Sequence, residues 1–339
     1  MTGDALDGKL VVTNGYAGSK KWTGTSLDGY AIMSTNTNEN ETKAGISFCV
    51  AVSENSLLKF KVKVDSDIGD VFLVTLDHVR YAGVGNLEAG EYDISIPLSE
   101  GEHDIAFIYS KDDSGFDGTD TVYVSKGTLE PFPVIIDGEK DAIYNGIAPV
   151  PVRHPISTNP HAWIGGGTAY VTNDKCGIYV YVEVIDTAIV EDTDGITDNE
   201  DGVKLYIDFA RSYYDECLEG LDYRNTAKPG GMKLGWISCT PAGEHNPTGV
   251  LGGGCGFEDV GCIMAASTLT DNGYAVEFFI PIAYGWLQSD NRIGFGIQIY
   301  DDSLDEDNEF DATFYSDAAA NGSASWWSYY DTLPEYELK

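Results

Sequence analysis

Two segments near the C-terminal end alternate apolar and other residues with a period of two, and this pattern constrains the fold more than any other. One face of residues 273–281 and one face of residues 293–300 are apolar throughout: Tyr274, Val276, Phe278 and Ile280, then Ile293, Phe295, Ile297 and Ile299. A period of two is typical of β-strands with one buried face. The sequence therefore predicts two half-buried strands of an antiparallel sheet.

Similar short segments fill the first part of the chain, without any helical pattern. They are residues 57–64, 70–76, 92–98, 103–109 and 121–124. Regularly spaced strands favour a sandwich or jelly roll, so the predicted fold class is all-β, with two β-sandwich (jelly-roll-like) domains in tandem. We place the domains at residues 1–130 and 131–339. The two prolines of segment 129–133 cannot extend a hydrogen-bonded ladder, so this segment is predicted to be a short extended linker.

The charge of the chain limits its partners. The 339 residues include 55 acidic and 20 basic side chains, which gives a net charge of −35. Such a field repels nucleic acid and anionic membranes. No apolar run approaches the ~18 residues that span a bilayer, so membrane insertion is not expected. A neutral polysaccharide, calcium or a cationic partner remains open, and an acidic surface also keeps a secreted protein soluble.

Five stretches of the second half occur in an order that resembles one family. They are an Ile-Asp-Gly opening at 136–138, strand-like runs at 177–186 and 201–208, and the segments 273–281 and 293–302. Over residues 134–339 the chain is similar to family-nine carbohydrate-binding modules, and the domain before it resembles jelly-roll domains of bacterial surface proteins. Together the two domains also resemble, more loosely, the starch-adherence proteins of gut bacteria. The resemblance implies sugar binding without catalysis, in an extracellular or cell-surface location.

Aromatic side chains are the candidate sugar ligands, because a flat ring covers the weakly polar C–H face of a pyranose. The carbohydrate-binding candidates are Trp326, Trp327, Tyr329, Trp236, Lys233 and Trp163. Adjacent residues on a strand face opposite ways, so an extended segment exposes at most one of Trp326 and Trp327. The alternative is that both belong to the core.

The family resemblance adds expectations for these residues. One of Trp326 and Trp327 matches one of two tryptophans that sandwich the sugar, and Lys233 falls near a family arginine. No aromatic residue occupies 194–201, where the second tryptophan is expected. The ligand pose is therefore expected to differ from that of the family.

Three acidic clusters are candidate sites for a structural calcium ion, because calcium prefers carboxylate oxygens. The first, at 301–311, contains Asp301, Asp302 and Asp305, and the second, at 192–201, contains Asp192 and Asp194. The third consists of Asp112, Asp113, Asp117 and Asp120. EF-hand spacing is not met. In the resembled family calcium has a structural role, and the alternative is a solvated acidic loop.

These observations predict a non-catalytic polysaccharide-binding protein whose partner is a glucan, with α-glucan such as starch as the first choice. The alternatives are a cellulose- or xylan-binding module, or an adhesin or scaffold that binds other surface or enzyme-complex proteins. An enzyme has little support: carboxylate pairs are uninformative among 55 acids, and no HExxH or GxSxG motif occurs.

Overall fold

The structure is a computed structural model of the whole chain. It describes residues 11–14, 19–67, 69–81, 87, 89–132, 134–158, 164–190, 201–209, 234–241, 263–282, 287, 291–301, 312–316 and 333–339. In these ranges the regular elements are β-strands and one short 3-10 helix, η3 (Ala142–Tyr144), which confirms the predicted all-β class. The described part of the chain holds no helix with the length and apolar character needed to cross a membrane.

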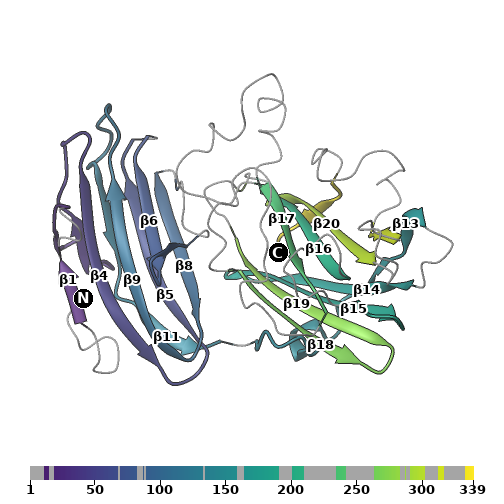
Figure 1. Cartoon of the computed structure of the whole chain (residues 1–339). Helices are drawn as coiled ribbons and strands as arrows, with labels where there is room; N and C mark the ends of the chain where they lie inside the picture. Colours follow the sequence, from purple (N-terminus) through teal and green to yellow (C-terminus); the bar gives the residue numbers. More distant parts are fainter. Residues whose placement is uncertain are drawn as a thin grey trace.

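Strands β1 to β11 form the first unit, which is a pair of sheets (Figure 1). One sheet has the order β1 (Val11–Asn14), β4 (Lys43–Val52), β9 (Gly101–Ser110), β6 (Val71–Leu76) and β7 (Val79–Arg80). The other contains β8 (Gly90–Leu98), β5 (Ser56–Asp65), β10 (Thr121–Val124), β3 (Ile32–Ser34), β2 (Trp22–Gly24) and β11 (Thr128–Pro131). Strand β5 buries Leu58, Phe60, Val62 and Val64, as its alternation predicts.

The first unit has an aromatic core. Trp22 is only 3% exposed, and its ring lies 6.3 Å from the ring of Phe72 and 6.4 Å from that of Phe107. Phe48 and Phe60 complete the cluster around Phe107. The tryptophan of this unit is therefore part of the core and offers no platform for a ligand.

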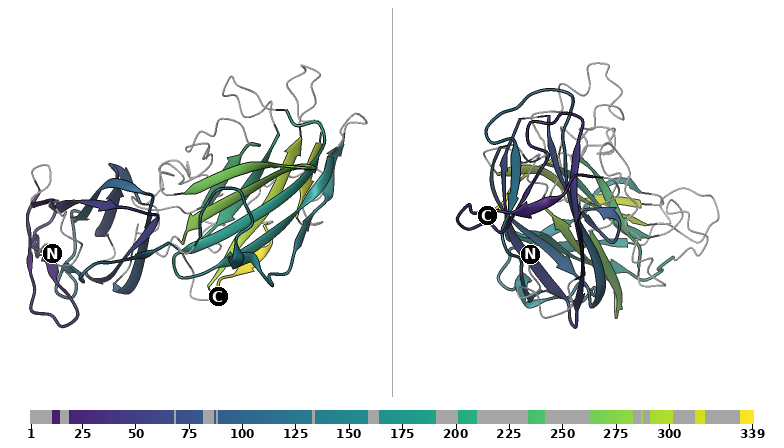
Figure 2. Two further views of the ribbon diagram at one scale, coloured as in Figure 1. Left: turned by 90° about the horizontal axis from the view of Figure 1, so that it is seen from below. Right: turned by 90° about the vertical axis from the view of Figure 1, so that its left-hand side faces the viewer.

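Strands β12 to β22 form the second unit, again as two sheets that face each other (Figure 2). One sheet has the order β12 (Val150–Val152), β14 (Ile164–Asn173), β15 (Gly177–Asp186), β19 (Gly273–Pro281) and β18 (Met264–Thr270). The other has the order β13 (His154–Thr158), β21 (Ala312–Tyr315), β20 (Arg292–Asp301), β16 (Gly202–Asp208) and β17 (Leu234–Cys239). Strand β22 (Glu335–Glu337) also pairs with β20.

The two segments that open the sequence argument are β19 and β20. Both apolar faces lie in the common core, as predicted, but the strands belong to opposite sheets. Both strands are also buried on their other faces, except for Arg292 at the start of β20, so the prediction of half-buried strands is wrong for both. In β19 the reason is that Ala275 and Phe279 of the second face are covered by Phe132, Val134 and Tyr144, which come before the second sandwich in sequence.

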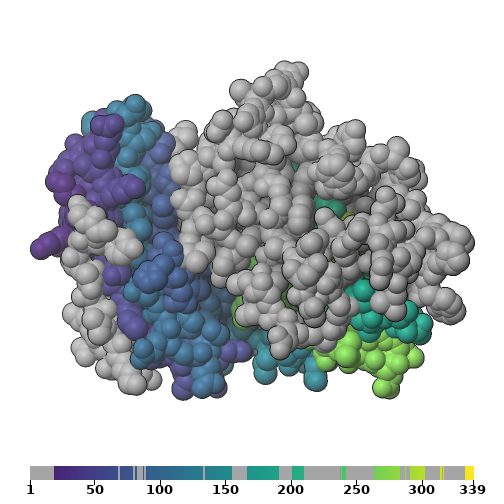
Figure 3. Space-filling view, in the orientation of Figure 1, coloured from purple at the N-terminus to yellow at the C-terminus, as the bar shows by residue number. Residues whose placement is uncertain are grey.

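The connection between the units is packed. Strand β11 runs to Pro131, which lies opposite Ser56 at the end of the strand, where a proline is tolerated. The linker prediction is therefore wrong for residues 129–131. Phe132 follows at once, with its ring 5.5 Å from that of Phe279, and Leu57 of the first unit joins the same cluster. The units meet in the space-filling view at the foot of the molecule (Figure 3).

A buried carboxyl group fastens the start of the second unit to β19. Glu277 is fully buried, and it accepts hydrogen bonds from the hydroxyl of Tyr144 at 3.0 Å and from the backbone N–H of Asp137 at 3.2 Å. Desolvation raises the pKa of Glu277 to about 8, although both hydrogen bonds oppose the shift. The group is therefore protonated in the folded protein at neutral pH.

This burial makes stability depend on pH. In the unfolded chain the carboxyl group releases its proton near the ordinary pKa of 4.5, whereas in the folded chain it holds the proton up to about 8. The contribution of this group to stability is therefore fully present below the lower pKa and is lost as pH rises through the upper one, a loss of at most about 5 kcal/mol. We expect the free energy of unfolding in urea to fall less between about pH 5 and about pH 9 for Glu277→Gln than for the wild type. The exposed substitution Glu139→Gln is the control, and equal losses in all three proteins would refute the assignment.

Candidate functional site: the outer face of β16 and β20, with a buried aspartate cluster

Four side chains share the face of β16 and β20 that points away from the core. The register sets Lys204 opposite Gln298, Tyr206 opposite Gly296, and Gly202 opposite Tyr300. The alternate residues, such as Leu205 and Ile297, lie in the core. We call Lys204, Tyr206, Gln298 and Tyr300 the polar floor.

The polar floor has a fixed geometry. The hydroxyl of Tyr206 donates to Oε1 of Gln298 at 2.6 Å, which orients the amide, and the ammonium of Lys204 lies 5.1 Å from the ring centre of Tyr300. Tyr206, Gln298 and Tyr300 are buried, whereas Lys204 is partly exposed. An ammonium and an amide beside aromatic rings is the combination of a few placed polar groups on apolar support that small-molecule sites use.

Of the predicted sugar-binding residues, only Trp236 lies within the described residues. Trp236 lies in β17, where its backbone pairs with Tyr206, and Lys233 directly precedes that strand outside the described residues. Also outside the described residues are Trp163, Trp326, Trp327 and Tyr329.

The chain that carries Trp326 and Trp327 is anchored at both ends to β20, the strand of Gln298. At one end the backbone N–H of Ser316 donates to the carbonyl of Ile297 at 2.9 Å. At the other end the backbone N–H of Phe295 donates to the carbonyl of Pro334 at 2.8 Å. The predicted aromatic platform and the polar floor are therefore attached to one strand.

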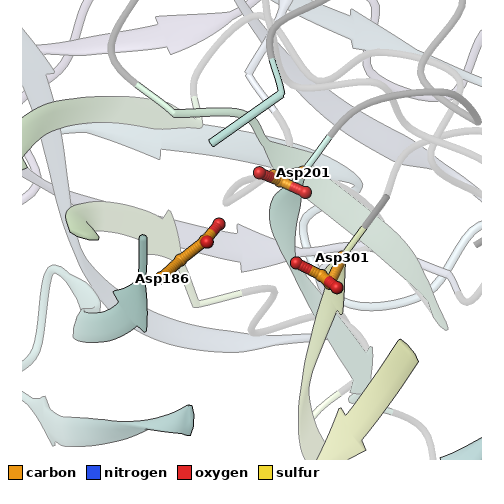
Figure 4. Close-up of side chains that lie close together, drawn as sticks. All are labelled: Asp186, Asp201 and Asp301. Carbon is orange, nitrogen blue, oxygen red and sulfur yellow. The ribbon is translucent and has the colours of Figure 1, made fainter. Parts of the chain in front are cut away.

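Three aspartates converge at one end of the second sandwich, as Figure 4 shows. Asp186 ends β15, Asp301 ends β20, and Asp201 directly precedes β16. One carboxylate oxygen from each lies within 4.8 Å of the others, and the side chains are 2%, 4% and 1% exposed, respectively. At an effective dielectric constant of about 20, two such charges repel by about 3 kcal/mol. A cation among the three carboxylates would offset this repulsion.

Buried polar atoms at this cluster also lack partners. Oδ1 of Asp186 accepts the backbone N–H of Ala188 at 2.8 Å, but its Oδ2 is buried and has no hydrogen-bond partner among the described residues. The same holds for the hydroxyl of Tyr274, which is fully buried. Desolvation and then the charge of Asp201 raise the pKa of Tyr274 well above its usual value. Both groups are explained if an ion lies among the carboxylates.

The donor set fits a hard divalent cation. Calcium takes oxygen ligands at about 2.4 Å, so two ligands on opposite sides of one ion are about 4.8 Å apart. Zinc is a poorer match because neither histidine nor cysteine contributes. Asp301 is a predicted ligand, whereas Asp302, Asp305, Asp192 and Asp194 lie outside the described residues. Asp201 is the last residue of the predicted acidic cluster at 192–201, whereas sequence reasoning did not single out Asp186.

One set of side chains has the residue types of a hydrolase triad but not its geometry. Nδ1 of His103 lies 2.7 Å from Oδ2 of Asp77, and Oγ of Ser99 lies 3.5 Å from Nε2. The stronger contact of Nε2, at 2.7 Å, is with the carbonyl oxygen of Ser99. Because a carbonyl only accepts, Nε2 carries the hydrogen and cannot take the proton of the serine hydroxyl. The cluster is therefore structural.

Comparisons with family models and with solved structures both found matches. The family model described as carbohydrate family 9 binding domain-like matches residues 136–332. A family 9 carbohydrate-binding module from Caldicellulosiruptor kristjanssonii, solved with glucose and with cellotriose, is 17% identical, with a TM-score of 0.45. The match covers 61% of this chain and 91% of that chain in the glucose complex, or 89% in the cellotriose complex.

A second structural match extends over both units. The tandem family 22 modules of Paenibacillus barcinonensis Xyn10C are 11% identical over 93% of each chain, with a TM-score of 0.24. No match was found among curated proteins. The family model covers more than half of the chain, and the chain therefore belongs to the carbohydrate family 9 binding domain-like proteins.

Proposed function

We propose that the protein binds a neutral polysaccharide without cleaving it, outside the cell or at its surface. The observation that carries the proposal is the family match over residues 136–332, whose members are carbohydrate-binding modules. The polar floor supports it, because Lys204 and Gln298 supply the donors that read sugar hydroxyls. A tryptophan from the chain between Ser316 and Leu333 would cover the pyranose ring, with stacking worth about 1–3 kcal/mol.

We further propose an α-glucan such as starch as the ligand. Two sequence features support this choice: the loose likeness to starch-adherence proteins, and the lack of an aromatic residue in 194–201. Without a second tryptophan the sugar is stacked on one side only, so the site differs from a two-sided clamp. Cellulose or xylan is the runner-up, and a protein partner on a cell surface or in an enzyme complex is the candidate from another class.

Native electrophoresis through gels containing amylopectin, hydroxyethylcellulose or xylan separates these possibilities. We expect retardation in amylopectin relative to a gel without polymer. Retardation only in one of the other two gels assigns that polysaccharide and rejects the α-glucan. Equal mobility in all gels rejects sugar binding and favours a protein partner. Release of reducing ends during prolonged incubation would contradict a non-catalytic role.

We also propose that calcium occupies the site of Asp186, Asp201 and Asp301 as a structural ion. The supporting observation is the buried, unpartnered Oδ2 of Asp186 between two further carboxylates. When bound, the ion supplies the positive charge that holds the ends of β15 and β20 and the start of β16 together. It takes no part in contacts with sugar.

A further inference from the structure

A buried lysine lies between two aspartates in the first unit, far in sequence from the sugar site. Lys111 directly follows β9, Asp70 directly precedes β6, and Asp120 directly precedes β10. The side chains of Lys111 and Asp70 are not exposed at all, and that of Asp120 is 2% exposed. Strand β9 belongs to one sheet and β10 to the other, so this cluster spans the sandwich. Sugar binding as described above does not use it.

The ammonium of Lys111 touches both carboxylates. Nζ lies 3.0 Å from Oδ2 of Asp70 and is in even closer contact with Oδ1 of Asp120. The rings of Phe116 and Tyr109 lie 5.2 and 5.8 Å from Nζ and help to exclude water. An amine and a carboxyl group are thus held in contact in a dry site.

The two carboxylates differ in their surroundings. Asp70 accepts hydrogen bonds from Ser66 at 2.5 Å, from Tyr109 at 2.7 Å and from the backbone N–H of Asp112 at 3.1 Å. Burial alone would raise the pKa of Asp70, but these hydrogen bonds and that of Lys111 outweigh it and lower the pKa. Asp70 therefore rests as a carboxylate.

Asp120 has the surroundings of an acyl donor. Its Oδ1 contacts Nζ of Lys111, and its Oδ2 accepts the backbone N–H of Asn38. A backbone N–H on that oxygen stabilises the negative charge that develops when a nucleophile adds to the carboxyl carbon. The two aspartates are thus suited to different roles, one as a proton relay and one as an electrophile.

We propose that Lys111 and Asp120 condense to form an isopeptide bond within the first unit. Asp70 takes one proton from the ammonium, and the neutral amine adds to Cγ of Asp120. Asp70 then returns that proton, with a second one from nitrogen, to one oxygen of the Asp120 carboxyl. The C–N bond forms, the C–O bond breaks, and one water leaves. Asp70 is ionised before and after, and no oxidant, reductant or other reactant is needed.

The site supplies what the reaction lacks in water. Free amines and carboxylates do not condense appreciably in water, but groups held in reactive contact react with effective molarities of about 10⁵–10⁸ M. Removal of water also lowers the cost of converting the ion pair to a neutral amine and acid. The product joins the end of β9 to the start of β10 and closes residues 112–119 into a covalent loop between the two sheets.

The mass of the intact, denatured full-length protein tests the proposal. We expect the mass of the purified protein to be lower by one water than the mass calculated from its sequence. Trypsin should not cleave after Lys111. A branched peptide that joins the segments of Lys111 and Asp120 should account for the difference. A wild-type mass equal to that of the sequence, with normal cleavage after Lys111, overturns the proposal without any variant.

Two conservative variants test the assigned roles. Asp120→Asn should lose ammonia instead of water, because the amide nitrogen becomes the leaving group. Asp70→Asn should keep its full mass, because it lacks the proton relay. If Asp70→Asn instead loses ammonia, the bond forms at residue 70 and the assignment to Asp120 is wrong. None of these masses depends on sugar binding, so the result is separate from that of the gel experiment.

Discussion

Calcium is expected to raise the midpoint of thermal unfolding of the calcium-stripped protein by about 5–10 °C. An ion at a concentration about 100 times its dissociation constant stabilises the folded state by about 2.7 kcal/mol. For a unit of this size, each kcal/mol raises the unfolding midpoint by about 2–4 °C. The expected source is the cluster of Asp186, Asp201 and Asp301, where a bound ion would offset the repulsion between the buried carboxylates. Differential scanning fluorimetry with calcium and with excess chelator measures the effect.

The stability difference between Asp186→Asn and the wild type is expected to change sign between chelator and calcium. It removes one of three like charges but keeps Oδ1 as an acceptor for the N–H of Ala188. With chelator present, the variant should therefore be at least as stable as wild type. With calcium present it should be less stable, because a ligand is lost.

The exposed substitution Asp271→Asn is the matched control and should behave as wild type in both conditions. The same calcium shift in wild type and in Asp186→Asn would contradict the proposed site. No shift in wild type would contradict it as well. Sodium chloride at matched ionic strength separates ion binding from general screening of the acidic surface.

Loss of one tryptophan of the pair at 326 and 327 is the other large expected effect. If the segment is extended, its neighbouring side chains face opposite ways, and at most one indole of the pair can cover the sugar. We expect just one of Trp326→Ala and Trp327→Ala to abolish retardation in a glucan gel. A lost ring costs about 1–3 kcal/mol, which is at least about a fivefold loss of affinity. The other variant should lower stability and leave affinity unchanged.

Phe116→Ala is the control for this pair, since Phe116 is an aromatic residue of the first unit with half of its surface exposed. This substitution should change neither the retardation in a glucan gel nor the mobility in a gel without polymer. If both tryptophan variants keep full retardation while the wild type is retarded, the stacking residue lies elsewhere. Trp236 and Trp163 would then be substituted next.

Strand content and burial could be predicted from the sequence because they follow from local alternation. The apolar faces of β19 and β20 are an example, and so is the face of β5 that carries Lys59, Lys61 and Lys63 outside the core. That β19 and β20 lie in opposite sheets could not be predicted, because pairing depends on partners far away in sequence. Nor does any local pattern of β19 reveal that Phe132 and Tyr144 cover its second face.

The candidate site was predictable only in part, for the same reason. Asp186, Asp201 and Asp301 each occupy the end of a strand, on the side of that strand that faces the core. A count of inward positions along 177–186 and 201–208 would have found the first two. Their convergence is a property of the assembled sandwich. Lys204 and Gln298 escaped notice because isolated polar residues on a strand usually mark a solvated face.

Isothermal titration calorimetry with maltoheptaose tests the central claim most directly, namely that the face of β16 and β20 binds a glucan. Saturable heat is predicted for the wild type and for Tyr206→Phe, which loses the hydrogen bond to Gln298 but keeps the amide. Gln298→Ala should lose most of the affinity while it still unfolds cooperatively. If the wild type gives no saturable heat, or if Gln298→Ala binds as tightly as the wild type, this face is not the binding site.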